Sequence, residues 1–488
     1  MSTALKAITD RLRELGLLVG ERGALPDRIE TVTDDSRAAK GGALFVAVRG
    51  SVRDGHDYLQ AVETQGAAAA IVEDPNRTTL PAIIVNDARR AAAAAAAVAN
   101  GDPARKLEII GVTGTNGKTT TVGLLRHLLD ARAGRSASIG TLGVLIGSDG
   151  EALDGGSGLT TPGPIELQRV LAALVARGVT RVAMEVSSHS LHQHRVEGIV
   201  FAAGVFTNLT RDHLDYHGTM EAYLAAKALL IGLLAPDGTA VVNADDDAWQ
   251  SLPAAPRRLT FSAEGRDADV RALDVRYRPR GSEWTLATAS ERAQVRLPLI
   301  GAFNVANALA ASGAALAVGV DVATIAERLS RAPQVPGRLE LLHDAPAVLR
   351  DYAHTPDALE RALDAVRPFA TRRLIVVFGA GGDRDKGKRP VMGDIATRKA
   401  DIAIVTSDNP RTEDPERILD DIEAGMHGRA HERVEDRRSA IARALSLAGD
   451  DDVIVLAGKG HETYQIRGTV KHHFDEKEIV HELTAAGR

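Results

Sequence analysis

The sequence predicts an α/β protein of three domains, spanning residues 1–103, 104–337 and 338–488. At 488 residues the chain is too long to form one hydrophobic core. Short apolar runs typical of buried strands alternate with helical patterns, which is the order found in α/β folds. Two stretches with glycine and proline, Gly101-Asp-Pro103 and Pro333-Gln-Val-Pro-Gly337, mark the expected boundaries.

Composition narrows the class of protein. A hydrophobic content of 44% with 25% charged residues is that of an ordinary globular protein. The net charge of -6 argues against nucleic-acid binding through phosphate neutralisation, and the lack of cysteine excludes disulfides and thiolate chemistry. Neither a signal-peptide core nor an apolar run of about 18 residues is found, so we expect no membrane insertion. We expect a cytoplasmic enzyme.

The first domain reads as a small α/β unit. We expect a helix over Leu5 to Leu18 and buried strands at Ala43–Val48 and Ala68–Val72. A polar loop, Arg49 to His56, lies between the two strands. Asp35-Ser36-Arg37 could meet a phosphate through its hydroxyl and guanidinium, although a side-chain-capped turn explains the tripeptide better on chemistry alone.

The second domain opens with a glycine-rich loop, Gly111-Val-Thr-Gly-Thr-Asn-Gly-Lys-Thr-Thr-Thr121. It follows an apolar run and precedes a helical pattern at Val122–Leu129, which is the order of a phosphate cradle. Lys118 would reach the β- and γ-phosphates, and the Thr119 hydroxyl would serve a Mg²⁺ site. The loop is a variant, because Val112 occupies the position of the first glycine in the usual Walker A spacing.

Further along this domain, polar side chains follow two expected strands. Glu185 ends the strand that begins at Thr180, where catalytic side chains of open α/β sheets gather, so we read it as a metal ligand with a structural ion pair as the alternative. The strand Phe201–Phe206 runs into Thr207–His217, whose carboxylates and histidines suit a metal or phosphate site or, equally, helix capping.

Two helical patterns complete this domain. Lys227 lies in an apolar helical pattern, and on residue chemistry alone a lone helical lysine is a solvated charge. Asn304 and Asn307 share one face of a later helix at i, i+3 spacing.

The third domain alternates strands with helices again, and each strand runs into a polar or glycine loop. The expected strands are Ala347–Arg350, Arg373–Phe378, Ile402–Thr406 and Val453–Ala457. The loops are Asp351–Pro356, Gly379–Lys386, Ser407–Arg411 and Gly458–Glu462. Such loops at the carboxyl ends of strands predict a ligand crevice in a Rossmann-like domain, and the absence of an acidic ribose partner argues against NAD.

Together these motifs resemble the Mur ligase family, ATP-dependent amide-forming enzymes of peptidoglycan precursor synthesis. The resemblance covers all three domains and rests on Gly114–Thr120, Glu185–His189, Asn208–His213, Asn304 with Asn307, Gly337-Arg338 and Asp351–His354. Gly379–Arg384, Asp408–Arg411 and Gly458–Glu462 resemble the members that add meso-diaminopimelate to UDP-N-acetylmuramoyl-L-alanyl-D-glutamate. The family's loop shares the departure at Val112.

The resemblance implies a three-domain fold: a small N-terminal α/β domain binding the uridine nucleotide, a central P-loop ATPase-like α/β domain binding ATP, and a C-terminal Rossmann-like α/β domain binding the amino acid. A carboxylate and an amine do not condense at neutral pH, because hydroxide is too poor a leaving group. The family phosphorylates the D-glutamate γ-carboxylate to an acyl phosphate, which the amine then attacks. We expect a monomer with two small-molecule substrates besides ATP.

The resemblance also assigns residues. Lys118, Glu185, His213 and Lys227 are implied to be catalytic, with Thr119 and Glu185 at one Mg²⁺, and His213 and Lys227 near a second. Lys227 is implied to be a carbamate formed with CO₂. The implied ATP contacts are Gly114, Thr115, Asn116, Gly117, Lys118, Thr119, Thr120, Asn304, Asn307, Arg338 and Asp351.

The two remaining substrates are assigned in the same way. The implied contacts of the UDP-linked substrate are Ser36, Ser51, Thr160, Thr161, Ser187, Gln193 and Arg195. Those of diaminopimelate are Arg384, Asp408, Asn409, Pro410, Arg411, Gly458 and Glu462. The loop Ser51-Val-Arg53 differs in composition from the His-Gln-Ala of some relatives.

Four alternatives stay open. A lysine-adding Mur ligase or a folylpolyglutamate synthase would share the glycine loop, but neither is expected to carry Asp408-Asn-Pro-Arg411. A GTPase or kinase-like switch would need a guanine motif, and no Asn-Lys-x-Asp is found. A nucleotide-binding scaffold without catalysis would have no need of Glu185, His213 and Lys227 together.

Overall fold

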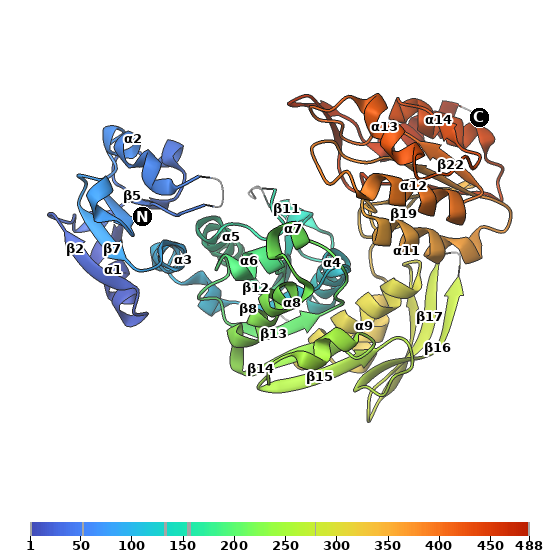
Figure 1. Cartoon of the computed structure of the whole chain (residues 1–488). Helices are drawn as coiled ribbons and strands as arrows, with labels where there is room; N and C mark the ends of the chain where they lie inside the picture. Colours follow the sequence, from blue (N-terminus) through green and yellow to red (C-terminus); the bar gives the residue numbers. More distant parts are fainter. Residues whose placement is uncertain (1, 51–52, 131–133, 154–157, 279, 487–488) are drawn as a thin grey trace. The chain divides into compact units, whose positions relative to one another are not determined.

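A computed structural model describes residues 2–50, 53–130, 134–153, 158–278 and 280–486 (Figure 1). The chain divides into two compact units. The first comprises Met1–Arg271, Thr288–Glu291 and Asn307–Arg328, and the second comprises the remaining residues. Helices and parallel sheets occur throughout both units, so the α/β class expected from the sequence is confirmed.

The N-terminal part of the first unit is a five-stranded sheet in the order β2-β7-β6-β5-β4, parallel except for β2. Its strands are β2 (Leu18–Arg22), β4 (Thr31–Thr33), β5 (Ala43–Val46), β6 (Ala69–Val72) and β7 (Ala82–Val85). Its helices are α1 (Leu5–Glu14), α2 (Leu59–Thr64) and α3 (Ala88–Ala99), and a two-residue pair joins β1 (Thr3–Ala4) to β3 (Arg28–Ile29).

One expected helix was too long. The prediction of helix to Leu18 is wrong, since α1 ends at Glu14 and Leu18 begins β2. Gly16 has a φ of +66°, and this left-handed residue stops the helix and turns the chain into the strand. The apolar pattern continued across the turn because Leu17 packs into the same core as Leu5 and Leu12.

The central sheet of the first unit places β8 (Glu108–Thr113) between two parallel neighbours, β12 (Val179–Glu185) and β13 (Phe201–Phe206). Beyond β12 lie β9 (Arg135–Gly140), β10 (Gly143–Ile146) and β11 (Glu151–Leu153), and beyond β13 lie β14 (Leu234–Asn243) and β15 (Arg257–Ser262). The helices are α4 (Lys118–Leu129), α5 (Pro164–Ala176), α6 (Ser188–His192), α7 (Leu214–His217), α8 (Met220–Ala228), α9 (Ala302–Ala317, whose first turn belongs to the second unit) and α10 (Val322–Leu329). The carboxyl ends of β12, β8 and β13 therefore meet at one edge.

The second unit contains a six-stranded sheet in the order β19-β20-β24-β21-β22-β23, parallel except for β19. Its strands are β19 (Glu340–Asp344), β20 (Ala347–Asp351), β21 (Leu374–Phe378), β22 (Ile402–Val405), β23 (Glu432–Arg433) and β24 (Val453–Ala457). Its helices are α11 (Pro356–Val366), α12 (Lys388–Lys399), α13 (Pro415–Glu423), α14 (Arg437–Leu447) and α15 (Glu476–Ala486). The four strands expected in this part of the chain are confirmed within one residue at each end.

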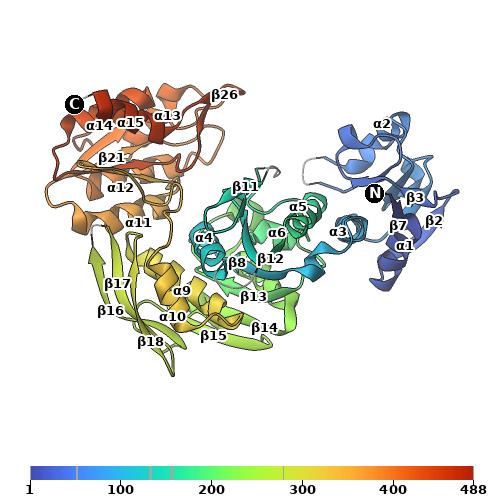
Figure 2. The ribbon, with the colours of Figure 1, turned by 180° about the vertical axis from the view of Figure 1, so that it is seen from behind.

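Two antiparallel additions complete the second unit. One consists of β17 (Gly281–Ala287) and β18 (Arg292–Leu297), which pair antiparallel and follow β16 (Val270–Arg278), a strand that begins in the first unit and pairs parallel with β15. The other is the hairpin of β25 (Tyr464–Arg467) and β26 (Val470–His473), which Figure 2 shows at the margin of the unit. Among the described residues, no helix combines the length and the apolarity needed to cross a bilayer.

Candidate active site

The glycine loop after β8 has the backbone of an anion cradle. Gly114 has a φ of +148° and Gly117, which precedes the first residue of α4, a φ of +86°. A Cβ on Gly114 would lie 1.9 Å from Thr207 Oγ1, and one on Gly117 would lie 2.2 Å from Asn307 Oδ1. Both positions therefore require glycine, and the loop delivers its N–H groups to the start of α4, where the helix dipole favours an anion.

The segment after β13 holds this loop in place. Asn208 accepts from Thr115 N through its carbonyl at 2.7 Å and from Asn116 N through its side chain at 2.9 Å. Asn208 Nδ2 and the Thr207 hydroxyl both donate to the Asn116 carbonyl, at 3.1 and 2.7 Å. Thr210 N donates to Thr115 Oγ1 at 3.0 Å. The motif beginning at Asn208 thus supports the cradle rather than standing apart from it.

Two lysines converge on the same loop. Lys118 Nζ donates to the carbonyls of Gly114 and Thr115 at 2.9 and 2.8 Å. Lys227 is 1% exposed, and its Nζ donates to the Gly114 carbonyl at 2.8 Å and lies 4.4 Å from the Tyr223 ring centre. Burial, and then the neighbouring Lys118 charge, hold the pKa of Lys227 well below its usual value. Lys227 is not the solvated charge that its residue type alone suggested.

Glu185 is buried at the end of β12, at 1% exposure. Its carboxylate accepts from Thr141 N at 2.8 Å and from the Thr141 hydroxyl at 3.2 Å. The printed contacts of the Glu185 carboxylate are both with Thr141, and across the part of the chain that the structure describes it has no ion-pair partner, so the structural ion pair considered from the sequence is wrong. A buried carboxylate that meets only neutral donors is a chemically suitable ligand for a cation.

The side chains expected to bind the sugar-peptide portion of a substrate gather around Glu185. The Thr161 hydroxyl donates to the Glu185 carbonyl at 2.9 Å and accepts from Ser187 N at 3.1 Å. Arg195 donates to the Thr161 carbonyl at 3.1 Å and to Gln193 Oε1 at 2.7 Å. Thr160 joins the group through a 3.3 Å contact between its hydroxyl and that of Thr141. Burial lowers the pKa of Arg195. Residues of three separate segments therefore form one hydrogen-bonded network.

A cluster of aromatic rings lies beside this network, and sequence reasoning identified only part of it. The His189 ring centre is 4.8 Å from that of His213 and 5.4 Å from that of His217. Tyr216 lies 4.2 Å from His189, and Tyr223 lies 5.2 Å from His217. Burial, followed by the neighbouring histidines, lowers the pKa of His189 to about 4, and burial also lowers the pKa of His213. The i, i+4 spacing of His213 and His217 was the available signal.

The described residues contain no group of three or more histidines or carboxylates placed to hold a metal ion. A cation here would instead use mixed donors. Thr119 lies buried in the first turn of α4, and Glu185 ends the adjacent strand β12. A carbamate on Lys227 would add an anionic oxygen at a position where burial lowers the pKa of the amine well below its usual value. These donor types fit Mg²⁺, which takes a few protein oxygens and keeps several waters.

Asn307, in the first unit, packs against the glycine loop, with its side-chain oxygen next to Gly117. In the second unit, Asn304 Nδ2 donates to the Ile300 carbonyl at 2.8 Å. The Arg338 guanidinium lies 5.1 Å from the Tyr352 ring centre, and Asp351 accepts from Leu339 N at 2.8 Å. Burial raises the pKa of Asp351 to about 6.

The loops after β21, β22 and β24 meet in the second unit. Gly382 N donates to the Asn409 carbonyl at 2.9 Å, and Arg411 Nη1 donates to the Gly382 carbonyl at 2.8 Å, which places Arg411 beside the loop carrying Arg384. Asn409 Nδ2 donates to Glu462 Oε2 at 2.8 Å. The residues predicted to bind diaminopimelate are thus drawn together, with Pro410 between Asn409 and Arg411.

Asp408 completes this group in an unusual way. It is 7% exposed, and its Oδ2 has no hydrogen-bond partner among the described residues. A Cβ on Gly458, whose φ is +118°, would lie 2.5 Å from that oxygen. Glycine at this position therefore lets the buried carboxylate oxygen pack directly against the backbone.

The site residues predicted in the N-terminal part of the chain have mainly local contacts. Ser36 begins the short 3₁₀ helix η1 (Ser36–Ala38), which Asp35 caps by accepting from Arg37 N at 2.9 Å. Arg37 also pairs with the Asp35 carboxylate at 2.8 Å. Ser51 lies outside the described residues, so its expected role stays a prediction.

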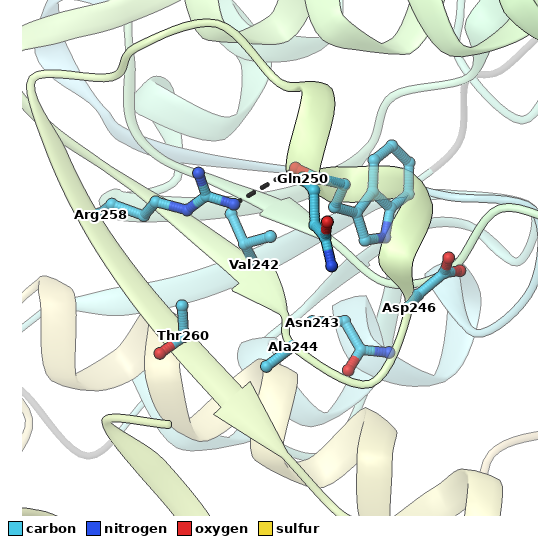
Figure 3. Close-up of a pocket in the computed structure, with 8 residues that line it drawn as sticks. Val242, Asn243, Ala244, Asp246, Gln250, Arg258 and Thr260 are labelled. Atoms are coloured by element: carbon cyan, nitrogen blue, oxygen red, sulfur yellow. Dashed lines mark hydrogen bonds between the residues drawn. The ribbon is translucent and has the colours of Figure 1, made fainter. Parts of the chain in front are cut away.

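A cavity of about 210 Å³ lies at the carboxyl ends of β14 and β15. Figure 3 shows Arg258, Thr260 and Asn243 around it, with Arg258 donating to the Trp249 carbonyl at 3.2 Å. Its Asp246 accepts from Leu209 N at 2.6 Å, so the cavity backs onto the segment that supports the glycine loop. None of the residues predicted for the site lines it.

Comparison with known proteins matches three parts of the chain to family descriptions. Residues 28–111 match the Mur ligase family catalytic domain, 112–315 the Mur ligase middle domain, and 337–460 the Mur ligase glutamate ligase domain. The UDP-N-acetylmuramoyl-L-alanyl-D-glutamate–2,6-diaminopimelate ligase of Gloeobacter violaceus is 45% identical over 98% of this chain and 99% of its own. The enzyme of the same name from Bacillus cereus is 41% identical over 93% and 94%.

A solved structure of a UDP-N-acetylmuramoyl-L-alanyl-D-glutamate–2,6-diaminopimelate ligase is similar over the full length. It is 34% identical, with a TM-score of 0.70, and the match covers 100% of this chain and 99% of the other. On this evidence the chain belongs to the Mur ligase family.

Proposed function

We propose that this protein adds meso-diaminopimelate to the D-glutamate of UDP-N-acetylmuramoyl-L-alanyl-D-glutamate with consumption of ATP, in peptidoglycan precursor synthesis. The ligase relatives at 41–45% identity support this proposal along nearly the whole chain. The observation that carries it is the buried oxygen of Asp408 that lacks a hydrogen-bond partner among the described residues, grouped with Asn409, Glu462 and the guanidinium of Arg411. An amino acid with an extra carboxylate and an extra ammonium needs such a mixture of charges.

Three segments divide this work in the proposal. Residues 1–103 take the uridine end of the substrate, with Ser36 and Ser51 among the contacts. Residues 104–337 bind ATP and the sugar-peptide portion, and residues 338–488 bind the amino acid. A monomer in the cytoplasm, where ATP is supplied, completes the proposal.

The glycine loop holds the phosphates of ATP through its backbone N–H groups, and Lys118 balances the charge on the γ-phosphate. Contacts to the base and ribose are assigned to Asn304, Asn307, Arg338 and Asp351. Mg²⁺, when bound, neutralises the phosphate oxygens and orients the transferred group. Thr119 and Glu185 would hold one such ion, and His213 with a carbamate on Lys227 would serve a second.

In the first chemical step the γ-carboxylate of D-glutamate attacks the γ-phosphorus of ATP, and ADP leaves. The Glu185 network, with Thr161, Ser187 and Arg195, orients the peptide that carries this carboxylate. In the second step the neutral amine attacks the acyl carbon, the tetrahedral intermediate expels phosphate, and the amine proton passes to solvent. One amide forms for each ATP cleaved.

A product assay tests the proposal directly. The purified protein is incubated with UDP-N-acetylmuramoyl-L-alanyl-D-glutamate, ATP, Mg²⁺ and either meso-diaminopimelate or L-lysine, and the products are analysed by mass spectrometry. We expect UDP-linked tripeptide containing diaminopimelate, with ADP and phosphate in equal amounts. Equal use of lysine would support the lysine-adding alternative. In a parallel incubation with a folate, glutamate and ATP, ligation of glutamate to the folate would support the folylpolyglutamate alternative.

A further inference from the structure

Lys459 is a buried lysine in the loop after β24, and the proposed function gives it no role. Its side chain has no exposed surface. Its Nζ lies 3.1 Å from Asn409 Oδ1 and 3.4 Å from Glu462 Oε2. Removing an ammonium group from water costs free energy unless partners replace the lost hydration. The partners of this lysine are two residues already assigned to the amino-acid site.

The three side chains form a closed triangle. Asn409 Nδ2 donates to Glu462 Oε2 at 2.8 Å, and Asn409 Oδ1 also accepts from Ile466 N at 2.9 Å. An ammonium group can only donate, so Lys459 requires the amide oxygen of Asn409 on its own side and directs the amide nitrogen toward Glu462. Lys459 thereby fixes the orientation of both neighbours.

The two carboxylates near this triangle, Glu462 and Asp408, differ in whether a cation is paired with them. Lys459 counters the charge of Glu462. Asp408 has no ion-pair partner within the described residues, and its buried Oδ2 has no hydrogen-bond partner there. Of the two carboxylates, Asp408 is therefore left without a cation, whereas Lys459 already counters the charge of Glu462.

We propose that Lys459 is a positioning residue for the amino-acid substrate. It orients Asn409 and Glu462 and counters part of the charge of Glu462, so that two free carboxylates do not together repel the substrate's own carboxylates. The inference rests on the proposed function. It also accounts for selectivity, because diaminopimelate carries one more carboxylate than lysine and is repelled more strongly by an uncompensated Glu462.

The test uses Lys459→Met, which keeps an unbranched side chain as far as Cε and removes the charged Nζ. Lys477→Met, at an exposed position of α15, is the matched control. Steady-state kinetics should show a KM for diaminopimelate raised about tenfold or more, equal to about 1.4 kcal/mol of binding. The KM for ATP, the KM for the UDP-linked substrate and kcat should stay within about twofold of wild type, and any residual use of lysine should be less affected.

A double-mutant cycle separates positioning from a merely structural role. Glu462→Gln, added to Lys459→Met, removes the uncompensated charge, so the KM for diaminopimelate should fall back toward that of Glu462→Gln alone. If Lys459→Met loses its cooperative melting transition, Lys459→Gln replaces it and should show the same shift to a smaller degree. Additive effects of the two substitutions, or a fall in kcat with unchanged KM, would overturn the inference.

The two proposals fail in different ways. Absence of ligation by the wild-type protein would count against the proposed function. A wild-type enzyme that ligates diaminopimelate, together with a Lys459→Met variant whose KM for it is unchanged, would reject only the role of Lys459.

Discussion

Lys118 and Lys227 donate hydrogen bonds to one and the same acceptor, the carbonyl oxygen of Gly114, at 2.9 and 2.8 Å. Two amines on a single carbonyl repel one another if both are charged. The buried Lys227 is the one whose pKa is held low, and Lys118 is one of the causes. The pair therefore consists of Lys118, placed to meet a phosphate, and Lys227, whose buried amine is the more readily deprotonated of the two.

We predict that Lys118→Ala lowers kcat by roughly 10²- to 10³-fold, or about 3 to 4 kcal/mol, because an electrostatic stabiliser of the transferred phosphoryl group is lost. Single-turnover formation of ADP measures the effect. Lys106→Ala, at an exposed position before β8, should be indistinguishable from wild type. Near-normal turnover of Lys118→Ala would refute the assignment of the glycine loop to ATP.

We predict that Lys227 reacts with CO₂ to form a carbamate, since only a neutral amine adds to CO₂ and burial supplies that form. Lys227→Ala should be almost inactive, with partial rescue by added acetate as a small carboxylic acid. Removing CO₂ from the buffer should lower wild-type activity, and bicarbonate should restore it. Lys118→Ala is the control that acetate should not rescue. A mass spectrum or density that shows an unmodified amine in the metal-loaded protein would contradict the prediction.

We predict that Asp351 makes unfolding depend on pH in the acid range. Its native pKa is about 6 against an ordinary value of 3.8, so the native state holds a proton that the unfolded state has released. The contribution of Asp351 to the free energy of unfolding is therefore fully present below about pH 4. It is lost as pH rises through 6, and the loss is at most about 3 kcal/mol. Urea titrations at pH 4.5 and 7 give the free energy of unfolding at each pH. The difference between the two values should change in Asp351→Asn by the amount that Asp351 contributes in the wild-type protein. An equal pH dependence in both proteins would show that Asp351 does not titrate in this way.

We predict that Arg411→Ala raises the KM for diaminopimelate far more than the KM for ATP. A site that holds a carboxylate with a guanidinium rejects a substrate lacking that group, because its own charge is left unpaired. Lysine should accordingly be a very poor substrate of the wild-type enzyme. Arg417→Ala, at an exposed position on α13, is the control. Equal use of lysine and diaminopimelate by the wild-type enzyme would refute this role of Arg411 and leave the ligase assignment standing.

Local patterns predicted much of the fold. The strands Phe201–Phe206 and Val453–Ala457 were predicted to the residue, because each is a continuous run of apolar and small residues. The helix expected to reach Leu18 failed for the opposite reason. Its apolar period continued through a turn into a strand that faces the same core, and periodicity alone does not register such a change of element.

The candidate site was predictable where its residues follow strand ends in sequence. Glu185 and the glycine loop are of this kind, because adjacent parallel strands end at a shared edge. The pairing of Lys227 with Gly114, and of Lys459 with Asn409, joins residues far apart in the chain. From sequence alone, both lysines carry the pattern of ordinary surface residues. Their burial depends on packing that local propensity does not specify.

The docking of the glycine loop on Asn208 and Thr210 has a consequence for synthesis of the protein. The loop's supporting hydrogen bonds span 92 and 95 residues of sequence. On the ribosome, the nascent chain emerges with its glycine motif long before β13 and the segment after it are made. A fragment that stops short of Asn208 would carry the complete motif and lack the cradle. ATP can therefore act as a folding ligand only once most of the central sheet has been translated.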